Sequence, residues 1–486
     1  MKRLVWFFVA VVYGAFSGLA WGGEAAEIVR GPVLGSPSPT SIAVWLQASV
    51  PRTVRVTAVD VDSADAEIQS PWVVLEPEAR LMATVVIEGL EPGRSYRYQV
   101  ETADGTIWEH EEAIFRTPPE VGAPTRVTMA AGSGANHWAR FKTGVWSAIA
   151  DSDPDLFLAL GDTPYADGLL WVEDDFWEEA RDRYEASPSE EDRRLLDDLG
   201  DQYRRRAPEA MALSYESFRE TKKFNRMARK IFWVATWDDH ETGMDNGDRD
   251  NPVLAQAREA FKAFTPNPSF GADGEGVYWA QQWGDVDIIL LDDQTWRTPT
   301  TAALAEPESA TMLGNRQFDW LVDRLAGSKA VFKIVVNGSP FNDFSRKEDA
   351  WVGYPAERER LMDAIARNRV GGVVLLSGDV HRSEFFRLPW LEDRGGYPLF
   401  ELVTSPLFQR SRGCGESVPD REFCYGDPEK SILELFAWIE ADTTLGDPLL
   451  TLQVRDHRGE VMLDRHLRAS ELQWPAMPEE KAGAGR

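Results

Sequence analysis

Two hydrophobic patterns divide the chain. Between residues 28 and 119, short runs alternate apolar and polar positions and are separated by turn residues; they read SIAVWLQA, RTVRVTAVD, ATVVIEGL, SYRYQVET and EAIFRTPP. Alternation with a period of two is typical of strands that bury one face. Several short strands at this spacing predict a small all-β sandwich.

The segment GLEPGRSYRYQVE narrows the class of this first domain. Its residues Leu90, Pro92, Tyr96 and Tyr98 resemble the tyrosine-corner region of fibronectin type III domains. We therefore predict a fibronectin III-like sandwich over residues 28–119, followed by the Pro-containing linker TPPEVGAPT.

From residue 126 to about 470, the pattern changes to continuous apolar runs with polar tips. The runs RVTMAAGSG, DLFLALGD, IFWVATWDDHE, VDIILLDD, FKIVVNG and GGVVLLSGDVH alternate with stretches of helical spacing such as LVDRLAGS and ERERLMDAIARNR. Buried strands that alternate with helices predict a layered α/β domain. Ligands of such domains bind beyond the carboxyl ends of the strands, where the polar tips lie.

The remaining segments carry weaker signals. Residues 171–228 are rich in Glu, Asp and Arg, which predicts solvated helices; a lid that selects substrate is the alternative, because the segment joins two strands with polar tips. The stretch LLTLQVRDHRGEVMLDRHL predicts a hairpin that turns at Arg458 and Gly459. Residues 474–486 are predicted to be a flexible tail.

The N-terminus predicts export. Lys2 and Arg3 precede the apolar run Leu4–Ala20, and small residues follow, which is the layout of a signal peptide over residues 1–22; an uncleaved anchor is the alternative. No later run is long and apolar enough to span a bilayer. We expect a periplasmic or extracellular protein, with no stable membrane insertion after cleavage.

Charge and cysteine content each restrict the picture. Lys and Arg number 52 and Asp and Glu number 80, so the formal net charge is -28. Such a surface repels phosphate backbones, and no nucleic-acid polymer is expected as a partner.

The two cysteines, Cys414 and Cys424, lie in one loop that contains Gly and Ser. In an exported protein they predict one disulfide.

Three of the polar tips carry metal-ligating residue types. Asp162 lies in LALGDTPYAD, the ionisable run Asp238–Glu241 lies in WVATWDDHETGMDN, and Asp379 and His381 lie in VVLLSGDVHRSEF. Carboxylates packed together are unfavourable unless a cation neutralises them. Hydrolytic metal sites combine carboxylates with imidazoles, so a metal site is the hypothesis; capped turns and a structural histidine are the alternatives.

The order GD, DDHE, GDVH, each after its own apolar strand, resembles the calcineurin-like metallophosphoesterases, and most closely the alkaline phosphatase D (PhoD-like) family. The resemblance runs from Val127 to Leu463 and includes GEGVYWAQQWGDVDIILLDDQTWR and YPLFELVTSPL. It implies a layered β-sandwich core flanked by helices and a secreted phosphoesterase that uses metal-activated water on a small phosphate ester. Two or more divalent or trivalent ions are implied, with calcium, iron, manganese and zinc as candidates. We expect a monomer.

The resemblance also implies roles for single residues. Asp162 matches the position that bridges two metal ions, and Asp239 matches a ligand of the second ion. Asp379 and His381 would complete the two sites. His240 would face the leaving group or a phosphate oxygen, so His240 and Asp239 are the expected catalytic residues. Further positions expected to bind substrate or support the site are Tyr165, Asn246, Arg297, Glu401 and His137.

Three departures from the family pattern motivate alternatives. Gly-Ser-Cys reads Gly-Ser-Gly at residues 132–134, Gly-Asp-Asn ends in Thr163, and Asp-Thr-Arg reads Asp-Asp-Gln at residues 292–294. A soft iron ligand and a phosphate-gripping arginine are thus absent, although Arg297 remains. The alternatives are a non-catalytic binding protein on a degenerate scaffold and a hydrolase of another ester. Candidates to replace the missing ligand are Ser133, Asn136 and His137.

Overall fold

The structure is a computed structural model, which describes residues 28–63, 67–139, 143–170, 181, 183, 189–272, 274–344 and 348–476. The predicted signal peptide, residues 1–22, lies outside this range. Most of the predicted tail also lies outside it, but Trp474 packs against Tyr397 and donates its Nε1–H to the Val370 carbonyl at 2.9 Å. The tail prediction therefore begins too early. Within the described ranges, no helix is both long and apolar enough to cross a membrane.

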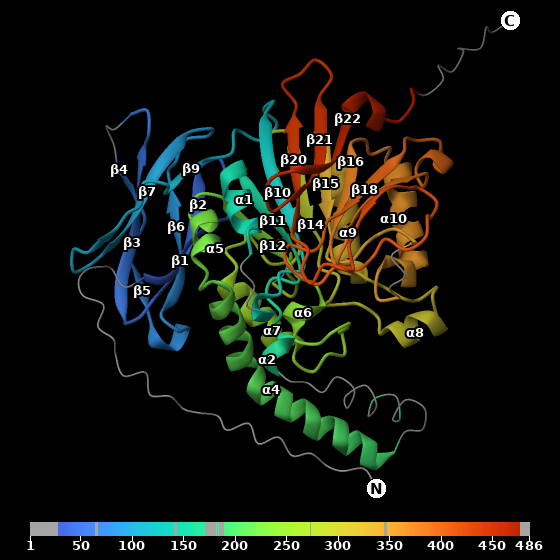
Figure 1. The fold of residues 1–486 in the computed structure, drawn as a ribbon, viewed down its shortest axis with the longest axis horizontal. Helices are drawn as coiled ribbons and strands as arrows, with labels where there is room; N and C mark the ends of the chain where they lie inside the picture. The colour runs from blue at the N-terminus through green and yellow to red at the C-terminus, as the bar shows by residue number, and fades with distance from the viewer. Residues whose placement is uncertain are drawn as a thin grey trace, which may run out of the picture.

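The N-terminal part is a two-sheet β-sandwich, which lies beside the larger α/β part (Figure 1). One sheet has the order β1-β2-β6 and the other β4-β3-β7-β8, with β5 on β3 and β9 on β7. The Tyr96 hydroxyl accepts a hydrogen bond from the Glu91 N–H at 2.8 Å, a contact typical of a tyrosine corner. The strands are β1 (Ile28–Gly35), β2 (Ser41–Ala48), β3 (Arg52–Asp60), β4 (Glu67–Gln69), β5 (Val73–Leu75), β6 (Met82–Glu88), β7 (Ser95–Thr102), β8 (Ile107–Trp108) and β9 (Ile114–Arg116).

The α/β part contains a six-stranded sheet of order β12-β11-β10-β20-β21-β22. Strands β10, β11 and β12 are parallel, whereas β20, β21 and β22 are antiparallel. The predicted C-terminal hairpin is confirmed as β21 and β22. The strands are β10 (Arg126–Gly132), β11 (Leu156–Leu160), β12 (Phe232–Thr236), β20 (Leu435–Asp442), β21 (Leu449–Asp456) and β22 (Val461–Arg468).

The second sheet has seven strands in the order β13-β14-β15-β16-β18-β17-β19. Strands β14, β15, β16 and β18 are parallel, so their carboxyl ends share one edge. The strands are β13 (Trp279–Trp283), β14 (Val286–Leu290), β15 (Phe332–Val336), β16 (Val373–Ser377), β17 (Ser383–Leu388), β18 (Leu399–Val403) and β19 (Arg421–Tyr425).

The two sheets pack face to face, and helices cover their outer faces (Figure 1). Strand β11 explains why the apolar runs are continuous. Leu156, Leu158 and Leu160 belong to the core between the sheets, while Phe157 and Ala159 belong to the outer cluster under the helices. The predicted fold class, a layered α/β core with flanking helices and an N-terminal β domain, is confirmed. The helices are α1 (Val145–Ser152), α2 (Asp167–Leu170), α4 (Glu190–Phe218), α5 (Lys222–Ala228), α6 (Asp239–Thr242), α7 (Leu254–Phe264), α8 (Thr300–Ala305), α9 (Gly314–Gly327) and α10 (Pro355–Arg367).

Helix α4 accounts for much of the charged segment. Ser189 caps it by accepting the Asp192 N–H at 3.0 Å, as expected at a helix start. Its first half is largely exposed, whereas its second half buries Tyr215 and Phe218 against the α/β core. The prediction of helices is confirmed for α4 and α5, and most of residues 171–188 lie outside the described ranges.

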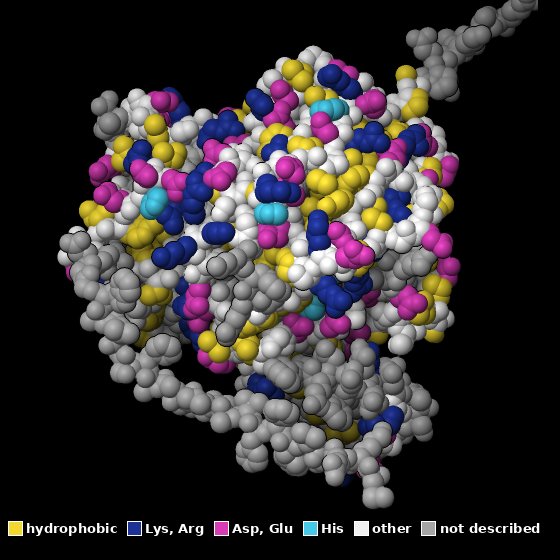
Figure 2. Space-filling view, in the orientation of Figure 1, with side chains coloured by type: hydrophobic (Ala, Val, Ile, Leu, Met, Phe, Trp, Pro, Cys, Tyr) yellow, Lys and Arg dark blue, Asp and Glu magenta, His cyan; other side chains and the backbone are white. Residues whose placement is uncertain are grey.

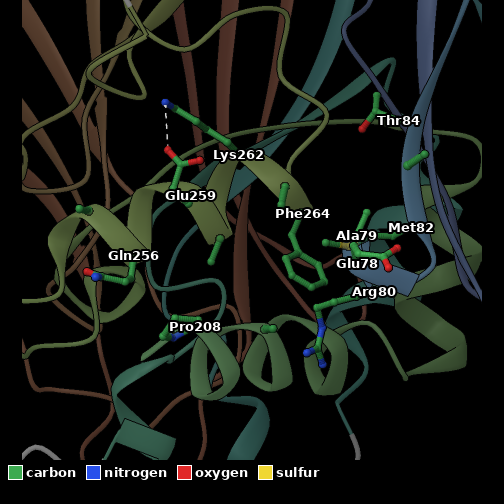
Figure 3. A pocket seen from close by; sticks show the side chains of 15 residues that line it. Glu78, Ala79, Arg80, Met82, Thr84, Pro208, Gln256, Glu259, Lys262 and Phe264 are labelled. Atoms are coloured by element: carbon green, nitrogen blue, oxygen red, sulfur yellow. Dashed lines mark ion pairs between the residues drawn. The ribbon is translucent and has the colours of Figure 1, made fainter. Parts of the chain in front are cut away.

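The sandwich and the α/β part meet along α4 and α7. Trp45, on β2, packs against Phe264 at a centroid distance of 5.7 Å. Arg80 pairs with Glu216 of α4 at 2.9 Å. A cavity of about 760 Å³ lies beside these contacts, lined by side chains from the β6 region, α4 and α7 (Figure 3). It contains none of the predicted site residues.

The predicted disulfide is present between Cys414 and Cys424. Cys424 lies on β19, which pairs with β17, and β17 begins two residues after His381. The loop that the disulfide closes therefore lies beside β17, the strand that follows the polar tip with Asp379 and His381.

Candidate metal centre

The polar tips of β11, β12 and β16 converge at one edge of the two sheets. Asp162 follows β11, where Gly161 has a φ of 85°. A Cβ on Gly161 would lie 2.4 Å from the Asp238 Cβ, so only glycine permits this approach of the two strand ends. Asp239 and His240 open α6 after β12, and Asp379 follows β16.

Three of the predicted residues form a compact group. One ligand atom from each of Asp162, Asp239 and His240 lies within 4.8 Å of the other two. Asp239 Oδ2 accepts a hydrogen bond from the Asn246 backbone N–H at 2.7 Å. His240 Nδ1 lies 2.8 Å from Asp167 Oδ2. Asn246 thus supports the site through its backbone, and Asp167 fixes the His240 ring.

Of the other predicted ligands, His381 joins this group through Tyr165, and Asp379 is held beside it by Ser133. The Tyr165 hydroxyl lies 3.2 Å from Asp162 Oδ2 and 3.3 Å from His381 Nε2. The Asp379 N–H donates to Ser133 Oγ at 2.9 Å, which ties the end of β16 to the end of β10. The structure therefore brings the four predicted ligands and His240 to one place.

Three of the predicted metal ligands have a left-handed backbone. The φ angles are 56° at Asp162, 68° at Asp379 and 55° at His381. Each such residue costs roughly 1–2 kcal/mol when it is not glycine. Strain at three ligand-type residues in one place is typical of a functional site, because surrounding contacts must hold them there.

The electrostatics of the group are those of crowded carboxylates. Burial raises the pKa of Asp162 well above its usual value; His240 opposes this, and the neighbouring carboxylates add to it. Burial lowers the pKa of the His240 imidazole, but Asp162 and the other carboxylates outweigh it, so the net pKa is well above its usual value. Burial, with Asp162, also raises the pKa of Tyr165, and a hydrogen bond from the Gln409 side chain opposes this.

Glu241 has a different task from its neighbours. Its carboxylate accepts hydrogen bonds from the backbone N–H groups of Asp162, Thr163 and Asp238. Burial raises the pKa of Glu241 to about 7, against the opposing effect of these bonds. Glu241 thus clamps the end of β11 to the end of β12 and points away from the ligand atoms.

The donor set fits a bound cation. Asp162 Oδ1 is buried and has no hydrogen-bond partner among the described residues. A buried charged oxygen without a partner is strongly unfavourable unless a cation binds it. The residues that can supply ligands are Asp162, Asp239, Asp379 and His381, and this set of carboxylates and one imidazole suits hard or borderline divalent ions.

Three of the supporting candidates make structural contacts. His137 packs against Trp138 at 4.2 Å, and burial lowers its pKa to about 3. The guanidinium of Arg297 is buried and donates to backbone carbonyls of Gly247 and Asp349. These contacts fit the supporting role that was one of the two roles expected of Arg297.

Glu401 is also structural. It is fully buried, and it accepts hydrogen bonds from the N–H groups of Phe341 and Asn342 at 2.8 and 3.0 Å and from the Ser377 hydroxyl at 2.6 Å. These donors satisfy the carboxylate, so Glu401 positions the loop after β15.

Gly134 and Gln294 stand at two positions where this chain departs from the family pattern, and the structure shows the contacts of both. Gly134 stands at the Cys position and has a φ of 70°, and a Cβ there would lie 3.0 Å from Ser405 Oγ. A thiolate ligand does not fit this backbone without a shift. Gln294 donates to Asp238 Oδ1 at 2.8 Å and accepts from Arg297 at 3.2 Å, so a buried amide fills the place of the family arginine.

The sequence argument missed Asp167 and the clamp by Glu241. Asp167 lies in the same LALGDTPYAD segment as Asp162, five residues later, but no local pattern shows that it meets His240. The Glu241 clamp joins positions 78 and 79 residues apart. Both contacts depend on how the strand ends meet.

Comparison with known proteins agrees with this geometry. Residues 129–442 match the family described as PhoD-like phosphatase, and residues 25–120 match a domain of unknown function (DUF7800). Alkaline phosphatase D of Bacillus subtilis (strain 168) is 28% identical over 187 residues, which cover 31% of this chain and 31% of that relative. The match thus spans less than a third of that relative's length.

Two solved structures share the fold. A structure of PhoD aligns with a TM-score of 0.64 at 18% identity, over 91% of this chain and 94% of that chain. The purple acid phosphatase PPD1 from yellow lupin (Lupinus luteus) seeds aligns with a TM-score of 0.59 at 14% identity, over 90% of this chain and 74% of that chain. These similarities concern the fold. Since the family match covers more than half of the sequence, the chain belongs to the PhoD-like phosphatase family.

Proposed function

We propose that this protein is a metal-dependent phosphoesterase that acts outside the cytoplasm on small phosphate esters. The observation that carries the proposal is the Asp162 carboxylate, whose buried Oδ1 lacks a partner among the described residues while Asp239 and His240 lie beside it. The family assignment supports the phosphatase chemistry. The N-terminal sequence pattern supports export.

Asp162, Asp239, Asp379 and His381 would hold the metal ions. Bound divalent ions supply Lewis-acid activation of water and neutralise charge on the phosphate oxygens. The protein residues supply the rest. Ser133 Oγ accepts the backbone N–H of Asp379, and the Asn246 N–H donates to the carboxylate of Asp239, so both residues are held in place before a ligand binds.

His240 is the group that can transfer a proton. Its Nδ1 is engaged by Asp167 at 2.8 Å, and its ring packs on Tyr165 at a centroid distance of 4.0 Å. These contacts fix the ring, and Nε2, which lies 3.8 Å from Asp245 Oδ1, is the nitrogen that can donate a proton to the departing oxygen. In the metal-free protein, against the effect of burial, nearby carboxylates raise the pKa of His240 well above its usual value and so favour the protonated ring.

The chain as a whole restricts the substrate. A formal net charge of -28 disfavours long polyanions, whose many phosphates would be repelled along their length. A small ester presents one scissile phosphate to the local site. We therefore propose monoesters or diesters of low molecular weight as the substrate class.

The test measures metal content and hydrolysis of p-nitrophenyl phosphate and bis-p-nitrophenyl phosphate at alkaline pH, with calcium, manganese, zinc and iron supplied in turn. Asp239→Asn removes one ligand charge, and Asp323→Asn, an exposed position on α9, is the matched control. We expect metal-dependent turnover in the wild type and the control, and its loss in Asp239→Asn. A protein inert with every metal would contradict the proposal.

The substitution at Gly134 favours one rival, a binding protein on a degenerate scaffold. The two readings differ in metal content, because the rival would bind metal weakly and would not respond to Asp239→Asn. Metal retained by the wild type and lost in the variant would exclude the degenerate site.

A further inference from the structure

We propose that Arg410 and Arg412 form an anion-binding rim beside the metal centre, and that this rim selects phosphate esters whose leaving group carries a second negative charge. The inference rests on the proposed phosphoesterase function and names the substrate class of the same site. The second charge is a carboxylate or a second phosphate, which share the planar or forked oxygen geometry that guanidinium groups bind.

The segment that carries these arginines is part of the wall of the site. Phe408 pairs with Ala135, two residues after Ser133. The Leu407 N–H donates at 2.7 Å to the carbonyl of Ser133, whose hydroxyl accepts a hydrogen bond from the Asp379 N–H at 2.9 Å. The segment therefore starts against the metal centre.

The segment also holds the loop of His381. The Arg412 N–H donates to the His381 carbonyl at 2.9 Å, and Ser411 Oγ donates to the same carbonyl at 3.3 Å. Arg410 and Arg412 are thus the sequence neighbours of Ser411, which hydrogen-bonds to the backbone of the candidate ligand His381. The backbone of this segment therefore lies directly beside the loop of His381.

The two side chains differ from most arginines of this protein. Both are exposed, and neither forms a side-chain hydrogen bond or an ion pair with any part of the chain that the structure describes. The nearby Arg382 and Arg421 instead pair with Glu384, at 3.0 and 2.8 Å. Asp427, whose N–H donates to Ser411 Oγ at 2.9 Å, pairs with Lys430 at 3.6 Å, so these nearby carboxylates pair with cations other than Arg410 and Arg412.

A positive rim is unusual on a surface with a net charge of -28. Figure 2 shows Lys and Arg side chains mixed with Asp and Glu side chains over this face of the molecule. Unpaired cations next to a phosphate site raise the local concentration of anions and orient them. The rest of the acidic surface would repel the same ligands, so the rim creates selectivity.

The scissile phosphate does not require these arginines. Ions held by Asp162 and its neighbours would neutralise that phosphate, whereas Arg410 and Arg412 are exposed side chains on the segment that continues from the wall of the site. Groups that reach this segment belong to the esterified alcohol. A second anion on the alcohol is therefore the part of the substrate that the rim contacts.

The rim is held in place before substrate arrives. The Cys414–Cys424 disulfide closes the loop that follows Arg412, and Arg421 donates to the Cys414 carbonyl at 2.9 Å. A Cβ on Gly426 would lie 2.1 Å from the Arg412 carbonyl oxygen, so this backbone is tightly packed. A fixed backbone lowers the entropy lost when the side chains bind.

The test compares three substrates of the metal-loaded protein: phenyl phosphate, 4-carboxyphenyl phosphate and 1,4-phenylene bisphosphate. The variant is Arg410→Gln with Arg412→Gln. The matched control is Arg360→Gln with Arg367→Gln, two exposed positions on α10, which runs away from the strand ends. Affinities of the non-hydrolysable phenylphosphonate and 4-carboxyphenylphosphonate give a readout that does not depend on turnover.

We expect the wild type to prefer a doubly anionic substrate in kcat/KM, and the variant to lose about tenfold of that preference. The phosphonate pair should show the same change in affinity ratio, and the control should keep the wild-type ratios. The carboxylate and bisphosphate compounds show which second anion the rim prefers.

Two results would overturn the inference. If phenyl phosphate is hydrolysed but the ratios do not differ between the wild type and the Arg410 and Arg412 variant, the rim has no role and the phosphoesterase function stands. If no ester is hydrolysed with any metal, and the phosphonates do not bind, both the function and the rim fail.

Discussion

Glu401 and Asp162 are both buried carboxylates near strand ends, yet their surroundings are opposite. Glu401 accepts hydrogen bonds from two backbone N–H groups and from the Ser377 hydroxyl. The Tyr165 hydroxyl lies 3.2 Å from one oxygen of Asp162, and the carboxylate of Asp239 lies beside the same side chain. A buried carboxylate with its own donors is satisfied by the fold, whereas carboxylates that face one another require a cation.

Glu241 shows that the two kinds of carboxylate can be neighbours in sequence. It accepts backbone N–H groups from both strand ends, while Asp239, two residues earlier, points its carboxylate at the ligand group. The clamp fixes the positions of the unsatisfied carboxylates. The difference between scaffold and ligand therefore lies in the donors around each group and not in residue type.

The largest effect is expected at Asp162. Asp162→Asn removes the charge of a carboxylate that would hold the metal ions, so hydrolysis should fall about 1,000-fold or more. The stability of the metal-free protein should not fall, because the substitution also removes repulsion among buried carboxylates. Steady-state kinetics and urea unfolding of chelator-treated protein check both parts. A large loss of metal-free stability would place Asp162 with the scaffold.

Glu401→Gln should have the opposite effects to Asp162→Asn: it should lower the stability of the protein and leave its metal binding unchanged. An amide NH₂ would face backbone N–H donors, so we expect the free energy of unfolding to fall by about 2–3 kcal/mol. The folded fraction should keep its metal. Chemical denaturation of this variant beside Glu429→Gln, an exposed control, measures the difference. Unchanged stability would contradict the scaffold role.

Asp167→Asn separates positioning from ligation. Loss of the Asp167 contact should lower kcat by about 10- to 100-fold while metal content is retained, because His240 loses its orienting partner. The pH profile of kcat should also shift, since Asp167 contributes to the raised pKa of His240, where burial opposes the carboxylates. A drop in metal content equal to the drop in rate would assign Asp167 to the ligand set.

The smallest effect concerns pH. In the metal-free protein, burial raises the pKa of Asp162, and the carboxylates, against burial, raise the pKa of His240. Each group binds its proton more tightly when folded, so its contribution to stability is complete below its unfolded pKa and is lost as pH rises through its folded pKa. We expect the metal-free protein to lose roughly 1–2 kcal/mol of unfolding free energy between about pH 5 and pH 9.

Metal should abolish this dependence, because a bound cation favours the deprotonated carboxylates. Urea unfolding at several pH values, with and without Mn²⁺, measures the contrast. A metal-free protein that becomes more stable as pH rises across this range would show that the carboxylates are already neutralised by the fold.

The sequence predicts most of the fold because strands buried on both faces read as continuous apolar runs. β11, β12 and β16 each appear at their predicted places, and Asp162, Asp239 and Asp379 follow them. The sequence does not separate ligand from scaffold, because that distinction depends on distant donors. Phe341 and Ser377 satisfy Glu401, and no local pattern around residue 401 shows this.

The most direct test is a titration of chelator-stripped protein with Mn²⁺, followed by thermal unfolding. If the facing carboxylates bind a cation, the unfolding midpoint of the wild type should rise by about 5 °C or more at saturation. The midpoint of Asp162→Asn should respond little. A wild-type midpoint that ignores the metal, or an equal rise in the variant, would contradict the account of this centre.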